Sequence, residues 1–348
     1  MSNKPTTIKE IAAILKVSVS TVSRALHNHP SIGITTQQKV QKLAKELNYE
    51  PNQSAIFFKK GKTSTIGLIL PELSEAFFSS AVSAIEDLAY QKNYTVLIAQ
   101  SHDDEQREKQ VIEMMKNHRV DGLIVSVAKT TSNFDPFEAL ERYGIPIVFF
   151  DRIPPIKNIH SVACNMETGT IAAVTYLLQI GHRCIGMING PATLAASEER
   201  KKGYFEAITK NRLKFDGSLV VSCDLTEKGT QEALDKLLAN KRRPTAIVTF
   251  NDYNALYAIK HARKLNLDLN KDLKFVSYAN LPLINYMDYV PIASVEQFPA
   301  LQGQKAAEIL FELLKNKTSS SDIFYHKVTI ESELVVNQLT DRNNLKLQ

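Results

Sequence analysis

The chain has 348 residues, of which 44% are hydrophobic and 23% are charged. This composition is typical of a folded, soluble protein of two or three domains and excludes a collagen-like, coiled-coil or wholly disordered chain. The net charge is +5, but residues 1–63 hold ten Lys and Arg against three acidic residues, and the remainder is nearly neutral. A basic head on a near-neutral body favours a nucleic-acid-binding module, with a solvated basic surface as the alternative.

Other compositional features restrict the compartment and the chemistry. No apolar run approaches the roughly 18 residues of a membrane span, and no signal-peptide pattern opens the chain. The three cysteines lie far apart without a CxxC motif, which fits neither a disulfide framework nor a zinc cluster. We therefore expect a cytoplasmic protein without a membrane contact, a metal or another cofactor.

The first two predicted helices are separated by a tight turn. Thr7 and Glu10 form a capping box that starts an amphipathic helix, and Ser18 is expected to cap a second helix whose Val22 and Ala25 face inward. A helix, a turn and a helix with small hydroxyls and one arginine outward predict a helix-turn-helix that reads the major groove of DNA. A three-helix bundle with a merely solvated second helix is the alternative. The outward residues are Ser20, Thr21, Ser23, Arg24 and His27.

A third helix and an apolar linker follow. Thr35 and Gln38 predict a second capping box, and the apolar spacing beyond them completes a small core. In the linker, Ile56, Phe57 and Phe58 stand next to a basic run. Apolar side chains in a basic linker are typical of wedges inserted between base steps in the minor groove. Packing onto the following domain is the alternative.

From residue 65 the sequence alternates between apolar runs and helical stretches. This alternation predicts parallel sheets covered on both faces. The number of strands favours two doubly wound lobes, with a ligand in the cleft outside the carboxyl ends of the strands. The expected strands cover residues 66–70, 94–99, 122–127, 147–150, 162–164, 185–188, 219–222, 246–250 and 275–278, and expected helices include residues 76–91, 105–117, 169–180, 198–210 and 230–239.

Several segments resemble one known family. Residues 7–12, 17–26 and 47–52 are similar to the head of LacI/GalR-type transcriptional regulators, and residues 119–124, 144–148, 181–183, 200–204, 243–246 and 251–252 are similar to its core. The resemblance runs from about residue 6 to residue 337. It implies a helix-turn-helix head over residues 1–50, a hinge helix and linker over residues 51–63, and a two-lobed core over residues 64–340 like periplasmic sugar-binding proteins.

The resemblance also implies which head residues contact DNA. Val19, Ser20 and Arg24 take major-groove reading positions, and Phe58 takes the minor-groove wedge. The sequence departs from the family at Lys16, where a turn glycine is common, at His27, where Asn is usual, and at Ile56, where Arg is frequent. The implied DNA-binding set is Thr7, Ser18, Val19, Ser20, Thr21, Ser23, Arg24, His27, Asn52, Ala55 and Phe58.

In the core, the resemblance implies a small-molecule effector site suited to a carbohydrate, because carboxylates and Arg bind vicinal hydroxyls and aromatic rings cover the apolar face of a sugar. Ala279 removes a carboxylate that relatives often carry, and Leu194 stands where purine-responsive relatives carry Arg. For each cleft charge, a solvated loop or a salt bridge between the lobes is the alternative. The implied effector-binding set is Phe77, Phe78, Asp151, Arg152, Arg200, Asn251, Asp252 and Asn280.

The expected function is therefore sequence-specific regulation of transcription, with repression favoured. A homodimer is expected to bind a near-palindromic double-stranded DNA operator under the control of a sugar or sugar derivative. A solute-binding protein of the sugar-transport class is the alternative, but it would lack the basic head. No catalytic motif such as GxSxG or HExxH is present, so we do not expect an enzyme.

Overall fold

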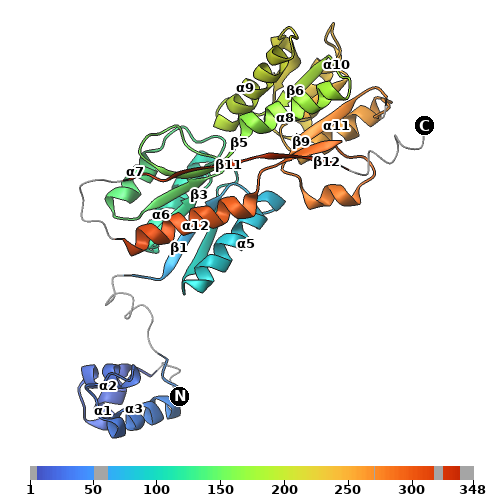
Figure 1. Cartoon of the computed structure of the whole chain (residues 1–348). Helices are drawn as coiled ribbons and strands as arrows, with labels where there is room; N and C mark the ends of the chain where they lie inside the picture. Colours follow the sequence, from blue (N-terminus) through green and yellow to red (C-terminus); the bar gives the residue numbers. More distant parts are fainter. Residues whose placement is uncertain (1–5, 51–61, 270, 317–323, 338–348) are drawn as a thin grey trace. The chain divides into compact units, whose positions relative to one another are not determined.

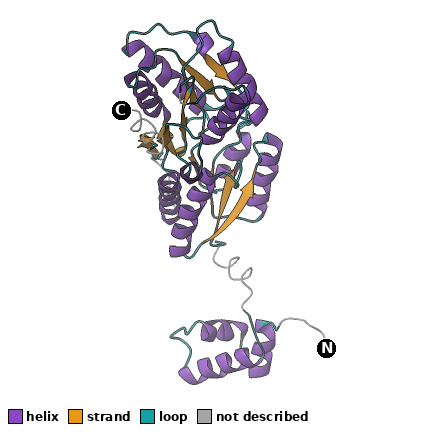
Figure 2. Ribbon diagram, turned by 90° about the vertical axis from the view of Figure 1, so that its right-hand side faces the viewer, coloured by secondary structure: helices purple, strands orange, loops and turns teal. Residues whose placement is uncertain are grey.

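The computed structural model describes residues 6–50, 62–269, 271–316 and 324–337. The chain forms two compact units, a head that ends at Thr63 and a core that begins at Ser64. Figure 1 shows the elements along the chain, and Figure 2 shows that the head is helical whereas the core combines helices and strands. None of the described helices is long and apolar enough to cross a membrane.

Three helices make up residues 6–50 of the head: α1 (Ile8–Leu15), α2 (Val19–Leu26) and α3 (Ile34–Glu46). The predicted capping box between Thr7 and Glu10 is confirmed, and so is the cap that Ser18 provides for α2. Lys16 ends α1 in the left-handed conformation with φ of 52°, a conformation that favours glycine. The departure from glycine at this turn is therefore accommodated without a change of fold.

The start of α3 differs from the prediction. Gly33 is the N-cap, and no side chain caps the helix. Thr35 lies inside the first turn rather than before it, so its hydroxyl is not at the position from which a capping box forms. The capping box predicted for Thr35 and Gln38 is wrong, although the helix itself is present.

The described residues of the core form two six-stranded sheets, each at the centre of one lobe. Lobe 1 has the strand order β11-β5-β4-β3-β1-β2, and lobe 2 has the order β12-β10-β9-β8-β6-β7. The strands of lobe 1 are β1 (Thr65–Leu70), β2 (Thr95–Gln100), β3 (Gly122–Val125), β4 (Ile147–Phe150), β5 (His160–Asn165) and β11 (Lys327–Glu331). Those of lobe 2 are β6 (Ile185–Asn189), β7 (Val220–Ser222), β8 (Ala246–Thr249), β9 (Lys274–Tyr278), β10 (Ala293–Glu296) and β12 (Glu333–Val336).

Helices cover both faces of each sheet, as the alternation of the sequence predicted. In β1, Ile66, Leu68 and Leu70 pack into one apolar cluster and Ile69 into another on the opposite face, because successive side chains of a strand point to opposite faces. The helices of lobe 1 are α5 (Ala76–Gln91), α6 (Glu105–Asn117), α7 (Asp135–Arg142) and α12 (Pro299–Lys315). Those of lobe 2 are α8 (Met166–Gln179), α9 (Ala195–Lys210), α10 (Glu227–Leu238) and α11 (Asp252–Lys264).

One strand departs from the expected parallel arrangement. β12 pairs antiparallel with β10, whereas the other pairs of strands in the described core are parallel. Only Ser332 separates β11 from β12, so the chain continues in one direction through both sheets (Figure 1). β11 runs parallel to its neighbour β5 and leaves lobe 1 at the carboxyl ends of the strands. The chain then enters lobe 2 at the carboxyl ends of the lobe 2 strands, and β12 runs from there toward their amino ends. It must therefore pair in the opposite direction.

The close packing of α12 on α5 supplies the first testable prediction. A Cβ atom on Gly303 would lie 2.5 Å from the carbonyl oxygen of Ala81 and 3.0 Å from its Cα atom. Overpacking costs about 1–3 kcal/mol, whereas alanine gains at most about 1 kcal/mol over glycine in a helix. We expect Gly303→Ala to lower the free energy of unfolding in urea titrations. Gly217→Ala is the control, because its nearest new contact is Phe215 at 3.7 Å; equal losses in both variants would contradict the packing argument.

Candidate functional site

The exposed side of α2 carries the predicted DNA-reading side chains. Val19 is 41% exposed, and Ser20, Arg24 and His27 are exposed as well. Val22 and Ala25 are fully buried on the opposite side. Helical spacing places residues 20, 24 and 27 on one face, which leaves this face free to contact a groove.

Local hydrogen bonds fix several polar groups of this face. The hydroxyl of Ser18 lies 2.7 Å from that of Ser20 and 2.8 Å from that of Thr21. The Nδ1 atom of His27 lies 2.8 Å from the carbonyl oxygen of Ser23, so Nδ1 is the donor and Nε2 remains for another partner. Thr7 is exposed and its hydroxyl accepts from the Glu10 amide. Asn52, Ala55 and Phe58, the predicted hinge contacts, lie outside the described residues.

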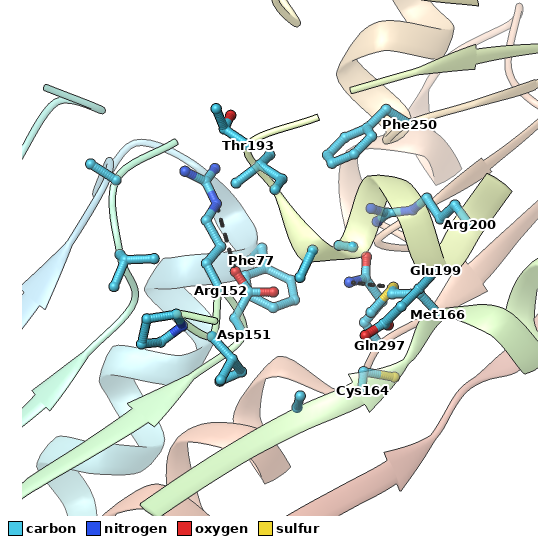
Figure 3. A pocket seen from close by; sticks show the side chains of 18 of the residues that line it. Phe77, Asp151, Arg152, Cys164, Met166, Thr193, Glu199, Arg200, Phe250 and Gln297 are labelled. Atoms are coloured by element: carbon cyan, nitrogen blue, oxygen red, sulfur yellow. Dashed lines mark hydrogen bonds and ion pairs between the residues drawn. The ribbon is translucent and has the colours of Figure 1, made fainter. Parts of the chain in front are cut away.

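A cleft between the two lobes of the core forms the second site. Its empty space, including the part open to solvent, is about 950 Å³. Side chains of both lobes line it (Figure 3), and many of them stand near the carboxyl ends of strands or the starts of helices. Six of the predicted effector residues line this cleft: Phe77, Phe78, Asp151, Arg152, Arg200 and Asn251.

Arg200, in the second turn of α9, is the most unusual group of the cleft. It is 3% exposed, and its guanidinium carbon lies 3.9 Å from the ring centre of Phe250 and 4.4 Å from that of Tyr278. Its Nε and Nη1 atoms have no hydrogen-bond partner among the described residues. Burial lowers the pKa of Arg200, and the nearby Tyr278 and Asp151 oppose that shift. A buried cation with free donors is costly unless something occupies the cleft.

Opposite Arg200, lobe 1 contributes Asp151 and Arg152 from the end of β4 (Figure 3). Burial raises the pKa of Asp151, and the two guanidinium groups of Arg152 and Arg200 oppose that shift. Asp151 adopts the left-handed conformation with φ of 59°, which an Asp tolerates better than most residues. No ion pair of 4.0 Å or less joins Asp151 to Arg200 within the described core, so opposite charges of the two lobes face one another across the cleft.

Other groups of the cleft were not predicted from the sequence. Burial raises the pKa of Glu75 and of Glu199, two carboxyl groups on its rim. Phe250 follows β8 directly, and Gln297 follows β10. The rule that ligands bind at the carboxyl ends of parallel strands could have singled out these last two positions.

Cys164 and Met166 belong to the same part of the cleft as Gln297. The side-chain amide of Gln297 donates to the sulfur of Met166 over 3.7 Å. Burial raises the pKa of the Cys164 thiol to about 12, which keeps it protonated and unreactive. These side chains lie where β5 and β10 pass from one lobe to the other, so they form the floor of the cleft.

Two predicted effector residues do not line the cleft. Asp252 is fully buried; its carboxylate accepts from the Leu281 amide over 2.7 Å and from the hydroxyls of Ser277 and Ser294. The side chain of Asn280 donates to Glu296 over 2.9 Å. Both side chains are occupied by bonds that join α11, β9 and β10, which explains why neither reaches the cavity.

Asp252 gives a pH prediction because burial raises its pKa to about 6. A carboxyl group whose pKa is higher in the folded state stabilises the fold at low pH, and this contribution is lost as the pH rises through about 6. Between pH 5 and pH 7.5 the loss is about 1.4 kcal/mol. We expect urea titrations to show a fall in the free energy of unfolding between the two pH values that is larger by about this amount in the wild type than in Asp252→Asn. An equal pH dependence in both proteins would contradict the assignment.

The two core departures from the family pattern both lie in the cleft wall. Leu194 is 4% exposed and Ala279 adopts φ of 90°. Positive φ is uncommon for a residue other than glycine. The wall is therefore apolar at both positions where the resemblance expects a polar side chain.

Comparisons with known proteins agree with this architecture. Residues 7–52 match the family described as bacterial regulatory proteins, lacI family, and residues 63–331 match periplasmic binding proteins and sugar binding domain of LacI family. A relative from Vibrio campbellii, the HTH-type transcriptional repressor PurR, is 30% identical over 97% of this chain and 99% of its own. The PurR repressor of Vibrio atlanticus is 29% identical over 94% of this chain and 98% of its own.

Solved structures show the same fold. A lac repressor dimer bound to operator and the anti-inducer ONPF superposes with a TM-score of 0.80 at 23% identity, covering 97% of this chain and 99% of that one. A ribose operon repressor from Burkholderia thailandensis, described as putative, has a TM-score of 0.71 at 27% identity, covering 79% and 99%. The family match over head and core excludes the transport protein and the enzyme. The chain belongs to the LacI family of bacterial regulatory proteins and is a DNA-binding regulator of transcription.

Proposed function

We propose that a carbohydrate or sugar derivative binds in the cleft of the core and controls the affinity of the head for its operator. Buried Arg200 carries this proposal, since its Nε and Nη1 atoms point to a missing acceptor. Sugar hydroxyls can accept from Arg200 and donate to Asp151, which faces it from the other lobe. Binding would then draw the two lobes together.

The apolar part of the cleft favours a ring-shaped ligand. Phe77 and Phe78 line the side of lobe 1, with their rings edge to face and 5.3 Å apart, and Phe250 lines the side of lobe 2. Aromatic side chains present flat apolar surfaces, and a few polar groups between them fix orientation. The combination fits a sugar, which has both hydroxyls and an apolar ring face.

Related structures support a sugar rather than a purine. One neighbour is a complex of the regulator CelR with cellobiose, and another is a complex with D-xylulofuranose. The relatives named PurR are nearer in sequence, but Leu194 replaces the Arg that the resemblance associates with purine response. Its burial in the cleft wall leaves no cation at that position for a purine.

We further propose a cytoplasmic homodimer whose two heads, residues 1–50, bind the half-sites of a near-palindromic operator. Residues 51–63 would serve as the hinge and residues 64–340 as the effector-binding and dimerisation domain. The boundary between the compact units at Thr63 supports this division. Typical couplings of about 1–3 kcal/mol between effector and operator would change operator affinity about 5- to 150-fold.

A ligand screen on the protein–DNA complex tests the proposal. Operators are first selected from random DNA, and the complex is then titrated with neutral sugars, sugar phosphates, purines and nucleosides. We expect a sugar or sugar derivative to change operator affinity and to raise the melting temperature of the protein. A response to purines alone would contradict the proposed effector class, and analytical ultracentrifugation checks the dimer.

The recognition helix supplies a prediction about specificity. Arg24 is the one long cation on the exposed face of α2, and Arg can bind guanine O6 and N7 together. We expect Arg24→Ala to lose about 1–3 kcal/mol at the contacted base pair and to relax the preference at one symmetric position of each half-site. Lys39→Ala, an exposed change on α3, is the control and should leave base preference unchanged. Uniform weakening by Arg24→Ala on all sequences would show a phosphate contact instead.

A further inference from the structure

Asp103, just beyond the end of β2, holds two cations at once. Its carboxylate accepts from Arg152 Nη1 over 2.5 Å and from the backbone amide of Lys129 over 3.0 Å. The Lys129 ammonium lies 3.7 Å from the same carboxylate. The side chains of Asp103, Lys129 and Arg152 are 20%, 27% and 14% exposed, so solvent screens these pairs less than it screens pairs on an open surface.

The ammonium of Lys129 also reaches the other lobe. Its Nζ atom donates to the carbonyl oxygen of Asp224 over 3.3 Å. Asp224 lies in the loop between β7 and α10 of lobe 2, and its carboxylate accepts from the amide and hydroxyl of Thr226. Lys129 therefore connects a loop of lobe 1 to a fixed loop of lobe 2 at the edge of the cleft.

The backbone is in the left-handed conformation on both sides of this contact, and it is strained at Leu225. His102 and Asp103 both adopt the left-handed conformation, with φ of 51° and 59°, and Leu225 has φ of 69°. For a bulky residue such as leucine this conformation is a genuine outlier, and such strain persists only where the surroundings enforce it. On the lobe 1 side the Thr130 hydroxyl donates to the Asp103 carbonyl over 2.8 Å. On the lobe 2 side the Asn254 side chain donates from Nδ2 to the Leu225 carbonyl over 3.2 Å.

Arg152 connects this contact to the effector cleft. It lines the cleft beside Asp151 (Figure 3), with its guanidinium carbon 5.7 Å from the ring centre of Phe78. The residues on either side of Lys129 along the chain include Ala128 and Thr131, which also line the cleft. Glu108, 1% exposed, fixes both by accepting from the Ala128 amide and the Thr131 hydroxyl over 2.7 Å and 2.6 Å.

We propose that Asp103 is a positioning residue that couples Arg152 in the cleft to a latch, formed by Lys129 and the carbonyl oxygen of Asp224, which holds the lobes together. One carboxylate is shared by two cations. Arg152 holds the Asp103 carboxylate in place, and that carboxylate holds the amide and the ammonium of Lys129. When Arg152 is removed or engaged elsewhere, Asp103 loses this support and Lys129 is no longer held against the Asp224 carbonyl. The latch thereby makes lobe closure responsive to what happens at Arg152. Its effect on operator affinity rests on the proposed function, whereas its effect on closure does not.

Distances between spin labels on the two lobes of the full-length chain test the latch without any effector. Glu86→Cys on α5 and Lys236→Cys on α10 are exposed positions for the labels, in a Cys184→Ser, Cys223→Ser background in which Cys164 stays buried. Labelled chains are diluted into unlabelled protein. We expect Lys129→Met and Asp103→Asn to lower the ratio of closed to open populations about two- to fivefold. Salt at 1 M should reduce the difference from the wild type, because the screening length falls to about 3 Å.

Three further variants separate the latch from other effects. Lys129→Arg should keep the wild-type ratio, because it retains the donor and the charge. Lys109→Met removes a lysine of lobe 1 that pairs with Glu105 on its own helix and should also leave the ratio unchanged. Arg152→Gln should lower the ratio although Arg152 makes no ion pair to lobe 2 among the described residues.

Melting temperatures and circular dichroism show whether each variant folds. Wild-type distances in both Lys129→Met and Asp103→Asn would overturn the latch. A wild-type ratio in Arg152→Gln would overturn the coupling to the cleft. Because no effector is used, these results are independent of the ligand screen: loss of the latch leaves the proposed effector class standing, and failure to find an effector leaves the latch standing.

Discussion

Raising the salt concentration from 50 to 200 mM is expected to weaken operator binding by this protein about 10³- to 10⁵-fold. Residues 1–63 carry ten basic and three acidic residues, and the two heads of the proposed dimer can neutralise about 6–10 phosphates. Each neutralised phosphate releases counterions, so log affinity should fall against log salt with a slope of about −5 to −9. Fluorescence anisotropy with a selected operator measures this slope directly.

A matched pair of charge changes controls this experiment. Lys228→Gln removes an exposed charge of the core and should leave the slope unchanged. Lys39→Gln removes an exposed charge of the head and should reduce the slope by about 1 if that lysine contacts a phosphate. A slope near zero for the wild type would contradict DNA binding through the basic head.

The second large effect is expected from Arg200→Met. The guanidinium is buried, and two of its nitrogens have no hydrogen-bond partner in the part of the chain that the structure describes. The substitution therefore removes a poorly satisfied charge and keeps an apolar side chain between Phe250 and Tyr278. Replacing a buried charge by a packed apolar group is often neutral or stabilising. We expect the free energy of unfolding to stay equal or to rise, while effector affinity falls by about 1–3 kcal/mol, or about 5- to 150-fold.

A free energy of unfolding that stays equal or rises while effector affinity falls distinguishes a ligand-binding side chain from one that stabilises the fold. Titration calorimetry with the effector found in the screen and urea unfolding measure the two quantities. Asp151→Asn should also weaken the effector and keep operator binding. Lys201→Ala, an exposed change next to Arg200 on α9, is the control for both quantities. A large loss of stability in Arg200→Met without loss of binding would show that Arg200 serves the fold.

The sequence by itself determined the features that depend on short-range patterns. The capping box at Thr7, the cap at Ser18 and the inward side of α2 depend on residues three or four positions apart, and each is present in the structure. The alternation of strands and helices likewise predicted two parallel α/β lobes. The expected strands end at residue 278, so β10, β11 and β12 were missed, and α7, α11 and α12 were not among the helices named. Of these, β11 and β12 are short and partly exposed along their length, and α7 has only eight residues.

Only the tertiary structure decided which polar residues share the cleft. Asp252 and Asn251 are neighbours in sequence, yet Asn251 lines the cavity and Asp252 is buried among Ser277, Ser294 and Leu281. No pattern of neighbouring residues indicates that Arg200 Nε and Nη1 lack hydrogen-bond partners in the described part of the chain. The same is true of the bond from Lys129 to Asp224, which lie 95 residues apart. Helix caps and the alternation of strands and helices arise from residues close together in the sequence. Which side chains are buried in the cleft, and which of them pair, depends on how the chain passes between the lobes after β5, after β10 and between β11 and β12. For that reason the sequence indicated the kind of site, and the fold decided which side chains form it.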